Sequence, residues 1–236
     1  MSKHLKRLAA PIAMRVSRKQ FYWVAKPHPG PHPLLRSVAL IVLVRDHLGL
    51  AKTAREAKAI LGARLVKVDG RVMTNPHFPV GLMDVVEIEK TGAHYRMLLD
   101  HHGRLTPIKI TKDEAQWKLC RVEDTHTLKG GVWQFNLHDG RNIQSTKARY
   151  KPGDTLQIEV PSQKVMGNFE FKEGATALII SGTHTGQLAK VSGQEIVKSS
   201  RPNIVKFAEG ITTVKPNVFV VGREKPEIQV VEKVVA

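Results

Sequence analysis

The chain has 236 residues, of which 42% are hydrophobic and 25% are charged, a composition typical of a folded protein rather than a disordered one. Lysine and arginine number 37 against 21 acidic residues, and the resulting net charge of +16 predicts a polyanionic partner, nucleic acid before an acidic membrane surface. The single cysteine, Cys120, excludes an internal disulfide, a four-cysteine zinc site and a CxxC redox pair. No apolar run reaches the ~18 residues of a membrane helix, and the N-terminus lacks a secretory signal pattern, so we expect a cytosolic protein.

Half of the net charge lies in residues 1–36, which contain eight lysines and arginines and no acidic residue. This segment also holds Phe21, Tyr22 and Trp23 in a row and, after Lys26, a run of alternating prolines that forbids a helix. An extended basic arm can neutralise phosphates while its aromatic side chains stack on bases, and we expect it to be disordered until it binds RNA. The alternatives are a solvated tail and an arm folded onto its own domain. Membrane binding is disfavoured because the prolines interrupt any apolar helical face.

The next segment predicts two helices. Residues 37–48 form an apolar run that indicates a buried helix ending before Gly49. Thr53 and Glu56 have the spacing of a capping box, in which the hydroxyl caps exposed N–H groups and the carboxylate bonds back to the start of the helix. We expect this second helix to end at Gly62 with a left-handed C-terminal cap.

Strand and turn signals dominate the rest of the chain. Asp69-Gly70 between two apolar runs predicts a two-residue hairpin turn, and the strand that follows at residues 84–89 completes a small α+β unit. One helical turn is expected at residues 113–117. Residues 228–234 are expected to form an edge strand or a loose tail. Further short strands, whose spacing predicts compact β barrels or sandwiches, are expected at residues 96–99, 104–110, 118–122, 132–137, 141–144, 155–160, 188–191, 204–207 and 218–221.

Two segments resemble modules of translation proteins. Residues 53–58 with 66–72 resemble the S4-type RNA-binding module, and Gly174 to Gly186 resembles the KOW motif. Flanking strings narrow the resemblance to one family, and they lie at residues 3–11, 29–33, 78–85, 118–120, 136–142 and 217–222. Together these strings resemble the ribosomal protein S4e family of archaeal and eukaryotic small ribosomal subunits, over nearly the whole chain.

The resemblance implies an α+β, mostly β chain with several domains. These are a basic N-terminal extension (residues 1–36), a small S4-like α+β RNA-binding domain (37–106), a central β barrel-like domain (107–170) and a KOW-containing, SH3-like β barrel (171–236). It implies a structural constituent of the cytoplasmic small ribosomal subunit whose partners are rRNA and neighbouring ribosomal proteins, with no cofactor, metal, membrane or small-molecule substrate. A non-ribosomal RNA-binding factor and an RNA-modifying enzyme remain as alternatives.

The expected RNA-binding residues are basic side chains and a glycine-rich turn. Thr53 caps a helix whose N-terminus attracts phosphate, with Lys52, Arg55 and Lys58 beside it. In the KOW-like turn, glycine N–H groups and an exposed His184 at the tip face the RNA. The full set is Lys3, Lys6, Arg7, Arg15, Arg18, Lys19, Lys26, His32, Arg45, Lys52, Thr53, Arg55, Lys58, Arg64, Lys67, Arg71, Gly182, His184, Gly186 and Lys190, with Lys172, Lys198 and Arg201 in support.

No catalytic site is expected. The sequence contains neither a GxxxxGK[ST] phosphate loop nor a GxGxxG fingerprint. His101 and His102 beside Asp100 have the composition of a metal or acid–base cluster, but two solvated histidines in a hairpin turn explain them more simply. Cys120 alternates with apolar neighbours and is expected to be a small buried residue.

Overall fold

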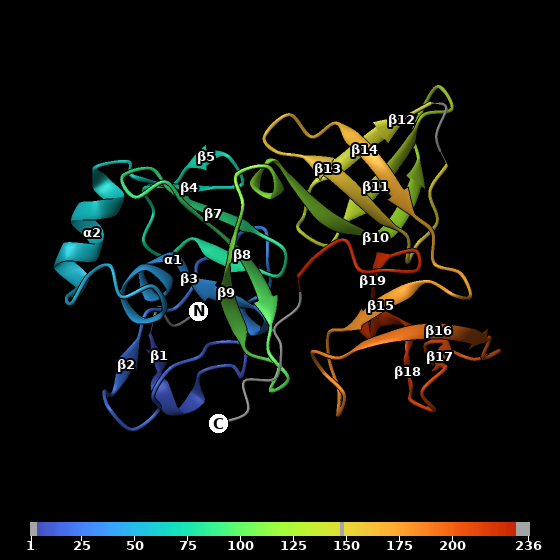
Figure 1. The fold of residues 1–236 in the computed structure, drawn as a ribbon, viewed down its shortest axis with the longest axis horizontal. Coiled ribbons are helices and arrows are strands. Elements are labelled where there is room, and N and C mark those ends of the chain that lie inside the picture. Colours follow the sequence, from blue (N-terminus) through green and yellow to red (C-terminus); the bar gives the residue numbers. More distant parts are fainter. Residues whose placement is uncertain (1–3, 147–148, 230–236) are drawn as a thin grey trace. The chain divides into compact units, whose positions relative to one another are not determined.

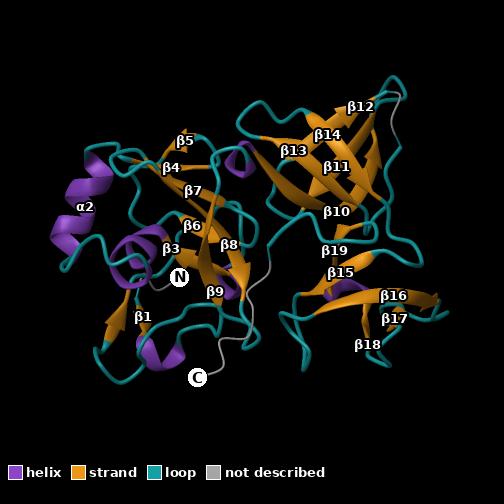
Figure 2. Cartoon of the chain, in the orientation of Figure 1, coloured by secondary structure: helices purple, strands orange, loops and turns teal. Residues whose placement is uncertain are grey.

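The computed structural model describes residues 4–146 and 149–229, and strands make up most of its regular structure (Figures 1 and 2). Tertiary contacts divide the chain into two compact units. The first comprises residues 1–100, 104–118 and 160–162, and the second comprises residues 101–103, 119–159 and 163–236. Among the described residues, no helix has the length and apolar character needed to cross a membrane.

The first unit is built around one antiparallel sheet with the strand order β5-β4-β7-β8-β9. Two small sheets, β1-β2 and β3-β6, accompany it. The strands are β1 (Leu5–Lys6), β2 (Trp23–Val24), β3 (Ser37–Ala39), β4 (Val66–Val68), β5 (Arg71–Val72), β6 (Pro79–Gly81), β7 (Val85–Ile88), β8 (Ala93–Leu99) and β9 (Leu105–Ile110). The helices are α1 (Leu40–Val42), α2 (Ala54–Gly62), a π-helical stretch η3 (Leu43–His47) and the short 3₁₀ helices η1 (Arg7–Ala9), η2 (Leu34–Arg36) and η4 (Glu114–Gln116).

The apolar run at residues 37–48 is buried as expected, but it is not one helix. Its first three residues form β3, which pairs antiparallel with β6, and only then does the chain turn into α1 and η3. Residues 38–44 are all buried. A continuous apolar run determines that a segment is buried without determining whether it is strand or helix, so the prediction of a single helix was wrong.

Helix α2 begins at its predicted cap and ends at Gly62 as predicted, but its C-terminal cap is different. Thr53 is its N-cap residue, and its hydroxyl accepts a hydrogen bond from the Glu56 N–H at 3.2 Å. Gly62 is the last residue of the helix, Ala63 is its C-cap, and the left-handed residue that follows is Arg64, with φ of 61°. The predicted left-handed cap at Gly62 was therefore wrong by two positions.

The hairpin at Asp69-Gly70 has the predicted form. Both residues have positive φ, 50° and 70°, the combination that a type I′ turn requires between two strands. The turn joins β4 to β5, and β4 pairs on its other side with β7. The predicted strand at residues 84–89 is confirmed as β7.

Residues 4–36 are folded onto the first unit. Strand β1 pairs with β2, the Leu105 N–H donates to the Ala13 carbonyl at 3.0 Å, and the His28 N–H donates to the His77 carbonyl at 2.8 Å. The expectation of an arm that is disordered without RNA is corrected here. Backbone pairing and buried side chains such as Met14 and Val24 hold the segment in place.

A completely buried lysine lies at the centre of the first unit. The Lys118 ammonium is 2.6 Å from Asp69 Oδ2 and 3.1 Å from Asp84 Oδ1, and all three side chains are buried. The second oxygen of Asp69 accepts the Val85 N–H at 3.0 Å. Asp69, in the β4–β5 turn, is therefore bonded both to Val85 of the neighbouring strand β7 and to Lys118, which follows η4.

His32 completes this cluster from the proline-rich segment. Its Nε2 donates to Asp84 Oδ2 at 2.9 Å, and the same oxygen accepts the Gly81 N–H at 2.9 Å. Position 81 has to be glycine because a Cβ there would collide with the His32 ring. Burial on its own would raise the pKa of Asp84, but the charges of His32 and Lys118 and hydrogen bonds from His32 and Gly81 hold that pKa below its ordinary value. A protonated His32 brings the four-group cluster to zero net charge.

The second unit contains two five-stranded sheets, with strand orders β12-β11-β10-β13-β14 and β18-β17-β16-β15-β19. The strands are β10 (Trp117–Thr127), β11 (Trp133–Leu137), β12 (Asn142–Ser145), β13 (Thr155–Glu159), β14 (Val165–Phe169), β15 (Thr176–Ile179), β16 (Leu188–Glu195), β17 (Ile204–Phe207), β18 (Thr212–Val214) and β19 (Val218–Gly222), with the 3₁₀ helix η5 at Lys215–Asn217. Strands β10 and β16 are longer than predicted, and β14 and β18 were not predicted. Residues 228–234 were expected to form an edge strand or a loose tail. Ile228 is buried, and residues 230–234 lie outside the described part.

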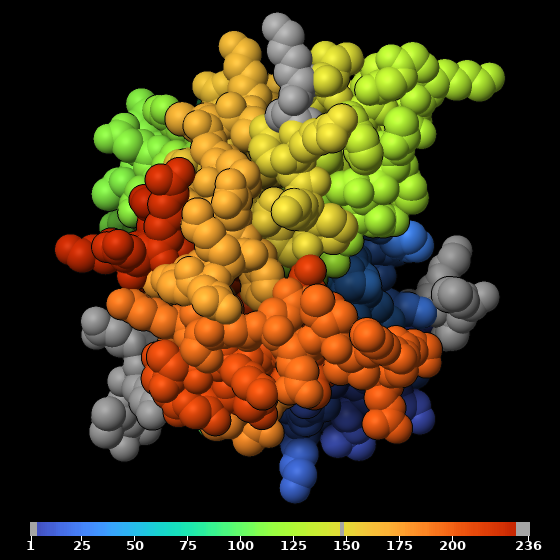
Figure 3. Space-filling model, turned by 90° about the vertical axis from the view of Figure 1, so that its right-hand side faces the viewer, coloured from blue at the N-terminus to red at the C-terminus, as the bar shows by residue number. Residues whose placement is uncertain are grey.

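Each sheet of the second unit has its own apolar core, and Arg121 connects the two. Phe135 and Leu156 belong to one core and Val205 and Phe207 to the other. The buried Arg121 donates from Nη1 to the carbonyls of Pro216 and Val218, both at 2.8 Å. Atoms of the two sheets, yellow-green and orange, adjoin in the space-filling view (Figure 3).

The buried cluster predicts a large loss of stability when its lysine is removed. Lys118→Met leaves two buried carboxylates without their ammonium partner, which costs about 3–5 kcal/mol in the free energy of unfolding. Urea denaturation of the full chain measures this. The control is Lys206→Met, which breaks an exposed pair with Glu195 at 3.0 Å and costs at most ~1 kcal/mol. Equal losses for the two variants would contradict the role assigned to the cluster.

The lowered pKa of Asp84 predicts an acid-sensitive contribution to stability. A carboxylate whose folded pKa lies below its unfolded value of about 3.9 stabilises the fold fully above that pH and loses the contribution as the pH falls toward the folded pKa. Between about pH 5 and pH 3 the free energy of unfolding should therefore fall more steeply for the wild type than for Asp84→Asn. Parallel pH profiles in urea titrations would show that Asp84 carries no such linkage.

Candidate nucleic-acid interface

The start of helix α2 presents three basic side chains on a completed cap. The Glu56 carboxylate accepts the Lys52 N–H at 2.9 Å, one residue before the cap. That backbone bond, followed by the Thr53 hydroxyl, lowers the pKa of Glu56, and the same hydrogen bonds place this acid in the cap. Ala57 and Leu61 are buried on the inner side of the helix. The exposed cations are Lys52, Arg55 and Lys58, and none of them forms an ion pair within the described ranges.

The loop after α2 and the β4–β5 hairpin add further basic side chains. Arg64 and Arg71 are both exposed, and Arg64 is the left-handed residue that follows the helix. Lys67 is half-buried, and its ammonium is 3.6 Å from Glu89 Oε1 on the neighbouring segment. An RNA phosphate would have to compete with this carboxylate, so Lys67 is the weakest candidate of the three.

Several basic residues of the N-terminal segment are used internally. Arg7 is buried, and its guanidinium donates to the carbonyls of Trp23 at 3.2 Å and Ser17 at 2.9 Å. His32 is buried in the cluster with Asp84. The expectation that these two bind RNA is corrected, because their polar atoms complete the fold.

Two more of the predicted arginines have intramolecular partners. Arg45 forms a double hydrogen bond with the Asp46 carboxylate, at 2.6 and 2.9 Å, and the bond to Asp46 raises its pKa. Arg18 donates from Nη1 to the carbonyls of Leu8 and Ala10, although its side chain lies at the surface. The exposed lysines and arginines of this segment are Lys6, Arg15, Arg18, Lys19 and Arg36, whereas Lys26 is half-buried and Lys3 lies outside the described residues.

Three consecutive aromatic rings stand exposed beside these cations. Phe21 and Tyr22 are each 62% exposed and Trp23 is 51% exposed, although apolar side chains of this size are mostly buried in folded proteins. The Lys6 ammonium lies 5.2 Å from the Tyr22 ring centroid, and the Arg7 guanidinium lies 5.0 Å from that of Phe21. Exposed rings with adjacent positive charge are what stacking on unpaired bases requires.

The glycine-rich turn between β15 and β16 is closed by its own hydrogen bonds. Gly182 and Gly186 have φ of 101° and 81°, as the sequence indicated. The buried Thr185 hydroxyl donates to the Gly182 carbonyl at 2.6 Å, and the Gly186 N–H donates to the Ile179 carbonyl at 2.8 Å. The expectation that the Gly186 N–H is available to RNA is therefore corrected. His184 is half-buried rather than exposed.

Other basic residues of the second unit differ in their surroundings. Lys190 on β16 is exposed, as are Lys198 and Arg201 in the loop before β17. Lys172 lies 3.3 Å from Glu170 in an exposed ion pair. No sequence signal indicated the short strand β18 or the position of Asn217 beside the glycine-rich turn. Both line a pocket that also contains Gly182 and His184.

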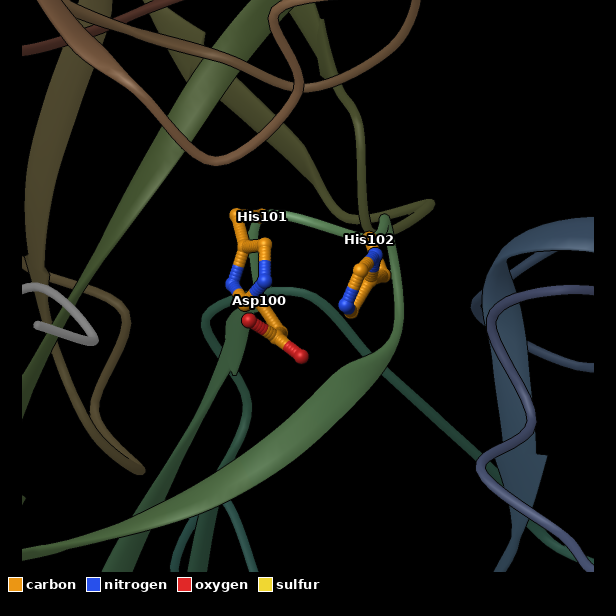
Figure 4. A group of neighbouring side chains, drawn as sticks. All are labelled: Asp100, His101 and His102. Carbon is orange, nitrogen blue, oxygen red and sulfur yellow. The ribbon is translucent and has the colours of Figure 1, made fainter. Parts of the chain in front are cut away.

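Two groups of possible metal ligands occur in the described part of the chain. Figure 4 shows the first, Asp100, His101 and His102, on the turn between β8 and β9, where both imidazoles are exposed and their centroids lie 3.9 Å apart. The second contains Cys120 and Asp139, and Arg141 lies 3.1 Å from the Asp139 carboxylate, where it competes with any cation. Cys120 is buried, as predicted.

Comparisons with known proteins agree with this arrangement of segments. Three family models match in succession: the RS4NT (NUC023) domain over residues 1–35, the S4 domain over residues 40–86 and ribosomal family S4e over residues 91–165. The S4 domain match contains α2 and the β4–β5 hairpin, with the exposed Arg55, Lys58 and Arg71.

Curated relatives extend the likeness to almost the entire chain. The small ribosomal subunit protein eS4 of Methanothermobacter thermautotrophicus is 40% identical over 230 residues, covering 96% of this chain and 95% of the relative. That of Methanocaldococcus jannaschii is 43% identical over 239 residues, with 96% and 97% covered. The crystal structure of the 30S ribosomal protein S4e from Thermoplasma acidophilum superimposes with a TM-score of 0.71 at 37% identity, covering 79% of this chain and 95% of that one. The chain belongs to ribosomal family S4e.

Proposed function

We propose that this chain is a structural constituent of the small ribosomal subunit that binds and stabilises folded rRNA. The observation that carries the proposal is the near-full-length similarity to proteins named small ribosomal subunit protein eS4. The net charge of +16 and the exposed cations around α2 supply the chemistry, because each phosphate contact releases condensed counterions from RNA. The proposed role includes no catalytic step and no cofactor.

The proposed binding surface has three parts on different segments of the chain. The first is the arm, with Lys6, Arg15, Arg18 and Lys19 beside the aromatic residues 21–23. The second is the S4-like module, with Lys52, Arg55, Lys58, Arg64 and Arg71 beside the cap residue Thr53. The third is the glycine-rich turn with Lys190. Linked modules bind a common RNA more tightly than each does separately, since one bound module raises the effective concentration of the next.

The finer domain description is part of the same proposal. We infer an N-terminal extension at residues 1–36, an S4-like domain at 37–106, a central barrel-like domain at 107–170 and a KOW-type SH3-like barrel at 171–236. The two five-stranded sheets of the second unit support the last two. In this proposal the chain acts in the cytoplasm, within the small subunit, alongside neighbouring ribosomal proteins.

The cap of α2 provides the direct test of the phosphate contacts. Replacing Lys52, Arg55 and Lys58 together by alanine should weaken binding to small-subunit rRNA and flatten its salt dependence, by about 0.7–0.9 logarithmic units of slope for each phosphate that no longer has a cation beside it. Filter binding or fluorescence anisotropy over a salt series measures both quantities.

The matched control removes an equal charge from lysines that have acidic partners. Lys67, Lys172 and Lys206 lie within 3.6, 3.3 and 3.0 Å of Glu89, Glu170 and Glu195, respectively. Their triple alanine variant should change affinity and slope less than the α2 variant does. If the α2 variant kept the affinity and slope of the wild type, α2 would not belong to the interface.

A further inference from the structure

A pocket of about 350 Å³ lies within the C-terminal sheet of the second unit. The turn that follows β15 lines the pocket through residues 181–184, and β18 lines it through Thr212–Val214. Ile179, Ile204 and Asn217 complete the lining. The volume is at the lower end of the roughly 300–1,000 Å³ range of small-ligand pockets, enough for one nucleoside.

Hydrogen bonds within the protein fix the turn that lines the pocket. The Ile180 N–H donates to the Asn217 carbonyl at 2.8 Å, which ties the turn to η5. The Thr185 hydroxyl closes the turn onto the Gly182 carbonyl. Gly182 has φ of 101°, which favours glycine, and it lies in ordinary contact range of the Asn217 side chain. The turn is therefore shaped before any ligand arrives.

The chemistry of the lining is polar and carries no formal charge. The described lining combines serine, threonine, asparagine and histidine with isoleucine and valine, and no lysine, arginine, aspartate or glutamate is among these residues. A phosphate site in proteins is built from cations or a cluster of N–H donors. This pocket offers the groups that recognise neutral, hydrogen-bonding rings instead.

We propose that this pocket takes one unpaired nucleoside of the bound RNA, base and ribose together. The inference rests on the proposed function and adds a site to it. Unstacked bases in RNA are recognised by stacking on aromatic or imidazole rings and by hydrogen bonds to their edges, and the ribose 2′-hydroxyl offers both a donor and an acceptor. His184 supplies the ring, and Asn217 and the threonine hydroxyls supply the hydrogen bonds. In a chain of net charge +16, the phosphates flanking this nucleoside find their cations outside the pocket.

Two substitutions test the pocket in the full chain. Thr213→Phe fills it from β18, and Asn217→Leu removes the amide but keeps the same branching of heavy atoms and the backbone carbonyl that Ile180 uses. The control is Gln194→Phe, which adds the same ring at an exposed position of β16 in the same sheet, outside the lining. Binding is measured by the anisotropy of fluorescein-labelled single-stranded oligoribonucleotides about ten nucleotides long, over a salt series. Thermal unfolding checks that each variant folds.

The two pocket variants should bind at least about fivefold more weakly than the wild type, the equivalent of removing one hydrogen bond, with an unchanged salt slope. Gln194→Phe should bind like the wild type. If both pocket variants bind like this control, the pocket proposal is overturned while the proposed function stands. A weaker affinity with a flatter slope would also overturn it, because the pocket would then contact phosphate. If the wild type binds no RNA, the proposed function itself fails. Should Thr213→Phe not fold, Asn217→Leu decides.

Discussion

The Lys118 ammonium, buried between Asp69 and Asp84, connects parts of the first unit that are far apart in sequence. Asp69 forms the β4–β5 turn, Asp84 precedes β7, and His32 joins from the proline-rich segment. Ions this deeply buried are tolerated only when each is paired and hydrogen-bonded, so the four side chains have to be correct together. His32, Asp84 and Lys118 belong to three of the short strings that carry the family resemblance, at residues 29–33, 78–85 and 118–120. They meet in one cluster, while Asp69 comes from the S4-like hairpin.

The fold uses some of its positive charge to hold itself together and leaves the rest on the surface. Lys118, Arg7 and Arg121 are buried and hydrogen-bonded to carboxylates or carbonyls. Exposed cations lie at the capped start of α2, on the arm beside its exposed aromatic rings, and at scattered positions of both units, including Lys112 and Lys190. A net charge of +16 therefore overstates the number of side chains available to RNA. The structure, not the sequence, separates the buried cations from the exposed ones.

Local signals predicted local structure well. The Asp-Gly turn and the capping box of α2 form where the sequence indicated, because their conformations depend on neighbouring residues. Long-range pairing was not predictable: β3 takes the start of an apparent helix because β6 is its partner, and β18 is too short to show a pattern. Among the site residues, Lys52, Arg55 and Lys58 are exposed as expected. Arg7 and His32 were placed among the RNA-binding residues because nothing in the sequence shows that they donate hydrogen bonds within the fold. Their acceptors are the carbonyls of Ser17 and Trp23 and the carboxylate of Asp84.

Sedimentation of a lysate through a sucrose gradient after a high-salt wash tests the proposed function most directly. Salt removes proteins that are held by nonspecific charge alone and leaves those with several modules embedded in folded RNA. The proposal predicts that this chain stays with the small subunit and with whole ribosomes, at about one copy per particle, as expected for linked modules on one RNA. Recovery of the chain mainly at the top of the gradient would contradict it and would indicate a free RNA-binding factor.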